Sequence, residues 1–111
     1  MEEGQIILAV FETDQEKKIR PALVLRKSPK YSDYLVCGIS SRLHEEIINF
    51  DFVLDKKHTD FLESGLKYDS LIRLFFLGIV REDEIIGSIG SIGNTTLFIL
   101  QKRLADYIIH R

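Results

Sequence analysis

The stretch Ile19-Arg20-Pro21-Ala22-Leu23-Val24-Leu25 decides the fold, because an arginine and a proline stand directly before a short apolar run. Proline has no backbone N–H, so it belongs at the start of a strand or on a sheet edge, and we predict a strand from Pro21 to Arg26. A second apolar run closes with Ile39-Ser40-Ser41. A guanidinium can donate two parallel hydrogen bonds to the oxygens of one phosphate. If the strand ends at Arg20 and Ser40 converge, they therefore indicate a phosphate or RNA site. The alternative is a surface arginine that only forms a salt bridge.

Short apolar and β-branched runs between polar loops predict a mainly β chain. The predicted strands are Gln5 to Phe11, Pro21 to Arg26, Tyr34 to Ile39, Glu46 to Leu54 and Ser70 to Leu77, with Ile79-Val80 as a continuation after Gly78. Arg73 interrupts the apolar face of the last long strand. One helical turn is expected between Lys57 and Gly65, with Phe61 and Leu62 facing inward. Residues 87–90 are too rich in glycine for a stable helix.

The last segment is the clearest helix. Asn94 or Thr95 can cap its start, and apolar residues recur at three- and four-residue steps on one face. These residues are Leu97, Leu100, Leu104 and Ile108. We expect this helix to pack across the sheet, so the fold class is mainly β with a C-terminal helix, built as a small, strongly bent sheet or barrel.

The composition is that of one soluble domain. The chain has 111 residues, a net charge of −2 and a single cysteine, which fits one domain over residues 1–111 without an intramolecular disulfide. An acidic start and the lack of an apolar stretch of about 20 residues indicate a cytoplasmic protein. Cys37 stands in an apolar run and is expected to be buried. The histidines lack ligand spacing, so we expect no metal site.

Positive charge is concentrated in one segment, although the whole chain is acidic. Six basic residues follow one another with no acid among them: Lys17, Lys18, Arg20, Arg26, Lys27 and Lys30. Such a patch attracts phosphate, because salt screens the more distant negative charges. The alternative is a solvated, lysine-rich loop. Tyr31 and Tyr34 stand beside this run and are candidates for stacking on RNA bases, with packing on the barrel as the competing interpretation.

Three sequence blocks follow one another in a distinctive order: Arg20-Pro21-Ala22-Leu23-Val24-Leu25, Ile39-Ser40-Ser41 and Asp69-Ser70-Leu71-Ile72. Their order and spacing resemble the MazF/PemK family of toxin–antitoxin endoribonucleases, and the resemblance extends from Gly4 to Ile109. It implies an SH3-like barrel of the MazF/CcdB type and a homodimer. It also implies cleavage of single-stranded RNA without a metal or cofactor, and inhibition by a cognate antitoxin.

The resemblance also implies roles for individual residues. The catalytic arginine of the family falls on Arg20, and its strand-ending hydroxyl falls on Ser40. In the implied reaction the ribose 2′-hydroxyl attacks the adjacent phosphorus, and both groups stabilise the charge that grows on the phosphoryl oxygens. A guanidinium stays protonated, so we assign the acid–base role to Glu16 as a hypothesis. The expected RNA-binding residues are Gln15, Lys17, Lys18, Ser41 and Arg42.

Two departures from the family pattern leave other functions open. The loop before Arg20 reads Asp14-Gln15-Glu16-Lys17-Lys18-Ile19, where relatives carry glycines, and a basic residue of many relatives falls on Gly78. One alternative is therefore a weak or inactive member that acts as a binding or regulatory module. Another is a CcdB-like gyrase inhibitor, because one fold hosts several functions. Retention of Arg20 and Ser40 favours the nuclease. For the dimer we expect a partner to cover apolar surface, such as part of Leu71 to Leu77 or the helix.

Overall fold

The computed structural model describes residues 1–12 and 14–110, without the side chain of His110. The described residues form six strands in one antiparallel sheet, in the order β4-β5-β3-β2-β1-β6. The strands are β1 (Gln5–Glu12), β2 (Lys17–Lys27), β3 (Asp33–Ser40), β4 (Phe52–Leu54), β5 (Ser70–Arg81) and β6 (Ile85–Ser91). The helices are α1 (Phe61–Ser64) and α2 (Asn94–His110), with two 3-10 turns, η1 (Leu43–Glu45) and η2 (Glu82–Glu84). The mainly β fold with a C-terminal helix is confirmed.

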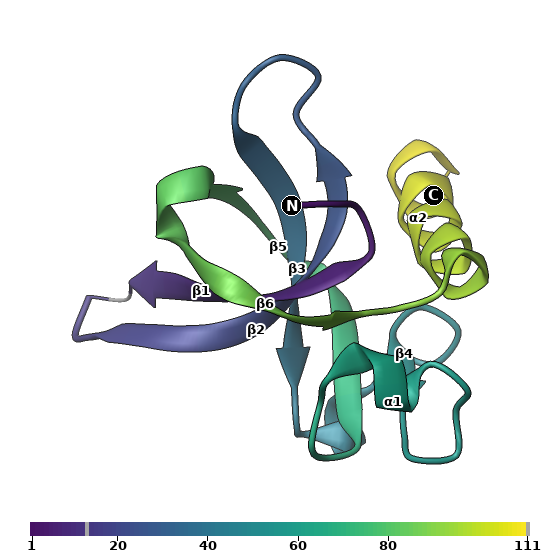
Figure 1. Cartoon of the computed structure of the whole chain (residues 1–111). Coiled ribbons are helices and arrows are strands. Elements are labelled where there is room, and N and C mark those ends of the chain that lie inside the picture. The colour runs from purple at the N-terminus through teal and green to yellow at the C-terminus, as the bar shows by residue number, and fades with distance from the viewer. Residues whose placement is uncertain (13, 111) are drawn as a thin grey trace.

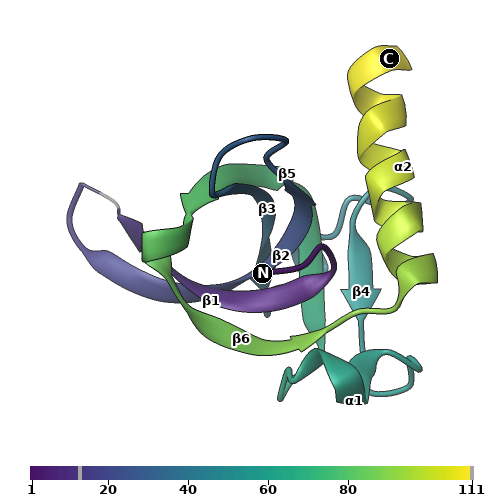
Figure 2. The same cartoon turned by 45° about the horizontal axis from the view of Figure 1, so that its top comes forward.

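The sheet curls into a half-barrel, and α2 stands outside it next to β4 (Figures 1 and 2). Both faces of the sheet are buried along the middle of β2, which explains why the run from Ala22 to Leu25 is apolar at every position. Leu23 and Leu25 of β2 join the core beneath α2, whereas Ala22 and Val24 join a second cluster. The two clusters alternate along the strand because successive side chains point to opposite faces. No described helix is both long and apolar enough to cross a membrane.

The strand that contains Pro21 begins earlier than the sequence predicts. β2 starts at Lys17, and its first half pairs only with β1, where Pro21 stands opposite Leu8. Pairing with β3 begins one residue later, at Ala22 opposite Gly38. Pro21 therefore lies where β2 is locally an edge strand, which suits a residue without a backbone N–H. The predicted start at Pro21 is wrong, while its expected edge position is confirmed.

The predicted strand from Glu46 to Leu54 is mostly wrong, since only Phe52–Leu54 forms β4. The backbone N–H of Ile47 donates to the carboxylate of Asp51 at 3.0 Å, and Asn49 has a left-handed φ of 65°. These features close a turn instead of extending a strand, because a short polar side chain that takes a local backbone hydrogen bond competes with sheet pairing. β5, by contrast, continues without a break through Gly78 to Arg81.

Strand β6 was not predicted, because its glycines are typical of a loop. The glycines instead allow β6 and α1 to approach closely: a Cβ on Gly90 would lie 2.2 Å from the carbonyl oxygen of Glu63. Gly65 ends α1 as predicted, with a left-handed φ of 74°. Leu62, expected to face inward, is 86% exposed. A helix this short presents one narrow face to the core, and Phe61 occupies it.

Helix α2 is confirmed, with Leu97, Leu100 and Leu104 buried against the sheet. Ile108, expected on the same buried face, is 68% exposed. The start of α2 is held by a residue far away in sequence: the Asp60 carboxylate accepts hydrogen bonds from the Thr96 hydroxyl at 2.6 Å and from the backbone N–H of Gly93 at 3.0 Å. Helix α2 is thereby attached to the segment before α1.

Candidate functional site

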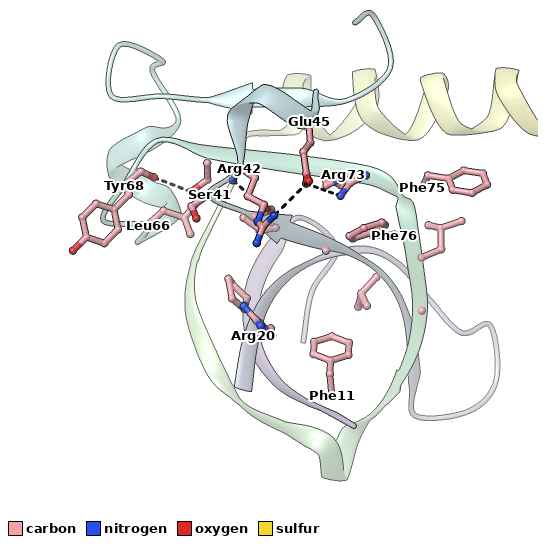
Figure 3. A pocket seen from close by; sticks show the side chains of 18 of the residues that line it. Phe11, Arg20, Ser41, Arg42, Glu45, Leu66, Tyr68, Arg73, Phe75 and Phe76 are labelled. Atoms are coloured by element: carbon pink, nitrogen blue, oxygen red, sulfur yellow. Dashed lines mark hydrogen bonds and ion pairs between the residues drawn. The ribbon is translucent and has the colours of Figure 1, made fainter. Parts of the chain in front are cut away.

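A cavity of about 1070 Å³ opens between the curled strands (Figure 3). Its walls come from the end of β1, the first half of β2, the end of β3, the turn that follows β3, and β5. This volume lies slightly above the usual range for small-ligand sites, about 300–1000 Å³. The cavity therefore has room for more than one nucleotide-sized group.

Arg20 and Ser40 both line this cavity. Arg20 stands on the part of β2 that pairs only with β1, opposite Ala9, so its side chain is not covered by β3. In the part of the chain that the structure describes, Arg20 has no hydrogen bond or ion pair. Ser40 is the last residue of β3, and its hydroxyl oxygen accepts the backbone N–H of Arg42 at 3.0 Å. The serine O–H itself donates to no described residue, so it is available to a ligand oxygen.

Ser41 and Arg42 also line the cavity, as members of the turn that follows β3. The structure thus brings together four of the residues expected from the sequence. The other four do not line the cavity: Gln15, Glu16, Lys17 and Lys18 lie where β1 turns into β2. Figure 1 shows this hairpin reaching out from the body of the sheet. The carboxylate of Glu16 is paired with the ammonium of Lys18 at 2.9 Å.

The basic segment is largely balanced by acids from elsewhere. Four of its members form ion pairs: Lys17 with Glu12, Lys18 with Glu16, Arg26 with Glu3 and Lys27 with Glu2. Lys30 instead lies 5.4 Å from the ring centre of Tyr31. Exposed ion pairs contribute little to stability, but they reduce the local positive potential. Arg20 differs from the other five because, among the described residues, its charge has neither an ion pair nor an aromatic contact.

A further arginine, Arg73 on β5, belongs to the same cavity. Its guanidinium lies 3.7 Å from the centre of the Phe76 ring and donates to the carboxylate of Glu45 at 3.1 Å. The same carboxylate lies 3.8 Å from the guanidinium of Arg42. In the sequence, Arg73 interrupts an apolar run, and this interruption is the one signal that could have identified it as a residue of the site. Its partner Glu45 stands 28 positions earlier and could not be identified from the sequence.

The cavity is electropositive, unlike the chain as a whole. Its described lining contains four cationic side chains and one carboxylate: Arg20, Arg42, Lys67 and Arg73, with Glu45. The whole chain carries a net charge of −2. A local excess of positive charge in a concave site attracts anions even when the total is acidic. The arrangement suits a polyanion such as the RNA backbone.

Part of the stretch from Leu71 to Leu77 is exposed apolar surface. Leu71, Ile72 and Leu74 are fully buried in the core. The exposed members are Phe75, Phe76 and Leu77, which follow Leu74 and also line the cavity. The ring of Phe75 lies 6.0 Å from that of Tyr107, which connects this surface to α2.

Three other residues considered from the sequence are now placed. Cys37 is buried, and burial, with the charge of Asp51, raises the pKa of its thiol to about 12. It is no nucleophile, because only a thiolate attacks. Tyr34 is buried and donates to Glu82 at 2.7 Å, so it does not offer a face for base stacking, whereas Tyr31 is exposed. Among the described residues, no three His, Cys, Asp or Glu side chains are grouped as metal ligands.

Comparison with known proteins gives one family and several similar structures. A family model described as "PemK-like, MazF-like toxin of type II toxin-antitoxin system" matches residues 2–108. An endoribonuclease in complex with its cognate antitoxin, from Mycobacterial species, has a TM-score of 0.72 at 12% identity, covering 98% of this chain and 95% of its own. MazE–MazF from Deinococcus radiodurans has a TM-score of 0.72 at 15% identity, with coverage of 97% and 95%.

The Mycobacterium tuberculosis toxin MazF-mt6 has a TM-score of 0.66 at 15% identity, with 92% of this chain and 95% of that chain covered. No curated protein matches the chain significantly in sequence. At these identities the structural likeness concerns the fold. The half-barrel with its C-terminal helix is thus the fold of these toxins.

Proposed function

Since the chain belongs to the PemK-like, MazF-like toxin family of type II toxin–antitoxin systems, we propose that it is an endoribonuclease that cleaves single-stranded RNA in the cavity, without a metal. The toxins of this family are endoribonucleases. The observation that carries the proposal for this chain is that Arg20 and Ser40 line the same electropositive cavity. We expect this activity in the cytoplasm, because the proposed RNA substrate is found there.

In the proposed reaction the ribose 2′-oxygen bonds to the adjacent phosphorus, and the bond from phosphorus to the 5′-oxygen breaks. The 2′-hydroxyl proton leaves to a base, and the departing 5′-oxygen takes up a proton. The products are a cyclic phosphate and a 5′-hydroxyl end. Arg20 and the O–H of Ser40 donate to the phosphoryl oxygens as negative charge grows there, and each such donor contributes about 2–4 kcal/mol in comparable oxyanion sites.

We assign the removal of the 2′-hydroxyl proton to Glu16. Because Glu16 lies between β1 and β2 and does not line the cavity, this role requires the β1–β2 hairpin to approach the cavity when RNA binds. Glu12, paired with Lys17 at the same end of the hairpin, provides a matched control. We expect Glu16→Gln to lower the cleavage rate by about a hundredfold, the lower end of the usual contribution of a general base. Glu12→Gln should retain the wild-type rate. Equal cleavage rates for Glu16→Gln and wild type would show that Glu16 is not the general base and that water or another group takes the proton.

The nuclease is tested by incubating purified protein with a long single-stranded RNA in the presence of a chelator. Discrete fragments are expected, and Arg20→Ala and Ser40→Ala should each reduce their formation by about a hundredfold or more. Arg81→Ala and Ser32→Ala remove the same types of side chain outside the cavity and should cleave like wild type. Intact RNA with a well-folded wild-type protein would refute the nuclease.

The antitoxin and a second copy of the chain are the proposed protein partners. Two similar structures are complexes of a toxin with its antitoxin. Phe75, Phe76 and Leu77 offer exposed apolar side chains beside the electropositive cavity, so an acidic, partly apolar segment could compete with RNA there. A homodimer would cover apolar surface on α2, where Phe98 and Ile108 are exposed. Light scattering showing only monomer at micromolar concentration would contradict the dimer.

One observation favours a weakly active member as the second candidate. Gly78 lines the cavity without a side chain, at the position where the resemblance to the family implies a basic residue in many relatives. A weak member would bind single-stranded RNA with the salt dependence of a phosphate contact but release no fragments. The same incubation, followed by a binding measurement, separates the two candidates.

A further inference from the structure

We propose that Arg73 forms a second phosphate-binding subsite of the cavity and binds an RNA phosphate other than the one held by Arg20. The inference rests on the proposed function, because it assigns a further part of the same cavity to RNA. It concerns a residue that stands in the middle of β5 rather than at a strand end, and that the assignment of the first phosphate does not use.

The Arg73 guanidinium is held in one place by two contacts. Its charged plane lies 3.7 Å from the centre of the Phe76 ring, and one of its terminal nitrogens donates to Glu45 at 3.1 Å. Its side chain is only 18% exposed, so the aliphatic stem is packed as well. Stacking together with an ion pair fixes a guanidinium more tightly than a single contact on a flexible stem, so little conformational freedom is lost when an anion binds.

The Arg73 guanidinium also has N–H donors that no described residue accepts. A guanidinium carries five N–H donors, and in the described residues only Glu45 accepts a hydrogen bond from this one. Glu45 is shared, since it also pairs with Arg42 at 3.8 Å. One carboxylate between two guanidinium groups leaves an excess of one positive charge at this wall. A ligand phosphate can satisfy both the remaining donors and the remaining charge.

Arg73 and Arg20 approach the cavity from different walls. β2 and β5 lie on either side of β3 in the sheet, so the two arginines stand on strands that do not pair with each other. Figure 3 shows Arg42, Glu45 and Arg73 joined along one side, with Arg20 and Phe11 on the other. The cavity of about 1070 Å³ between them has room for more than one nucleotide. Two fixed cations on separate walls suit two phosphates of one strand better than a single phosphate.

The test measures binding of a short, fluorescent, single-stranded 2′-O-methyl RNA, which cannot be cleaved through its 2′-oxygen, over a range of salt concentrations. Arg73→Met should weaken binding about tenfold. It should also reduce the slope of log affinity against log salt by about 0.7, the value expected for one lost phosphate contact on a single strand. Arg73→Lys should restore the slope but not the full affinity, because lysine keeps the charge without the planar fork.

Arg81→Met is the matched control, since Arg81 stands on the same strand but does not line the cavity. It should leave affinity and slope unchanged. If Arg73→Met behaves like Arg81→Met while Arg20→Ala weakens binding, the second subsite is refuted and the proposed function stands. If wild-type protein does not bind the oligonucleotide, both are refuted. If Arg73 variants lose binding but wild type cleaves no RNA, the subsite stands and the nuclease fails. Thermal unfolding of Arg73→Lys confirms that the comparison concerns folded protein.

Discussion

The buried carboxylate of Asp51 accepts a hydrogen bond from the backbone N–H of Leu74 at 3.1 Å. Arg73 of β5 stands opposite Gly38 of β3, and Leu77 stands opposite the adjacent residue Cys37. Residues 74–76 of β5 therefore have no partner in β3. The bulge keeps Leu74 in the core and turns the next two residues, Phe75 and Phe76, outward. A buried acid on a turn therefore shapes the cavity wall that carries Arg73, by holding an irregular stretch of strand.

Asp51→Asn should lower the free energy of unfolding by about 1–3 kcal/mol. The carboxylate accepts backbone N–H groups from both Leu74 and Ile47, whereas an amide has one oxygen and leaves a buried donor unsatisfied. Urea denaturation measures the loss. Asp106→Asn, an exposed substitution on α2, is the control and should change stability by no more than about 0.5 kcal/mol. Equal stabilities of Asp51→Asn and wild type would show that the carboxylate does not hold the bulge.

Asp60 should make the stability of the chain depend on pH in the acid range. The hydrogen bond from the Thr96 hydroxyl, with one from the Gly93 backbone, lowers the pKa of this carboxyl in the folded state. A lowered pKa stabilises the fold above the unfolded-state value, ordinarily about 3.9, and the contribution is lost as the pH falls through the folded-state value. Asp60→Asn should therefore be about 1 kcal/mol less stable at neutral pH, and this difference should shrink below about pH 4. A difference that stays constant across that range would contradict the role of the charge.

Cys37 should resist thiol reagents in the folded protein. Its thiol is buried and its pKa is raised to about 12, so neither access nor thiolate is available near pH 8. In protein unfolded by urea, the Cys37 thiol should react with the reagent at the rate of an ordinary cysteine. In the folded protein without urea, it should not react. Cys37→Ala should cleave RNA like wild type. Rapid labelling of the native protein, or loss of cleavage in this variant, would contradict a purely structural cysteine.

Gly78→Lys should strengthen RNA binding. A Cβ at Gly78 meets no atom within 4 Å, so a lysine fits there and adds a cation to the cavity lining. The slope of log affinity against log salt should become steeper by about 0.7. Gly87→Lys has equally open space on β6 but lies outside the cavity, and it should bind like wild type. If both lysines strengthen binding equally, the effect comes from total charge rather than from the cavity.

Much of this architecture is predictable because the decisive signals are local. Ala22, Leu23, Val24 and Leu25 alternate between two buried faces, so an unbroken apolar run reveals a central strand. Arg20 and Ser40 are recognisable because each stands at the end of such a run. β6 was missed because Gly90, typical of a loop, is required by the close approach of α1, which is a tertiary contact. The partnership of Arg73 with Glu45 and the bulge held by Asp51 depend in the same way on residues distant in sequence.

The central claim is that Arg20 and Ser40 support attack of a ribose 2′-oxygen on the neighbouring phosphorus. It is tested most directly by the ends of the fragments that wild-type protein releases from single-stranded RNA in chelator. The account predicts fragments with 5′-hydroxyl and cyclic phosphate ends, and no cleavage where the ribose before the scissile phosphate is 2′-deoxy. Cleavage at such a 2′-deoxy position, or fragments with 5′-phosphate ends, would contradict it.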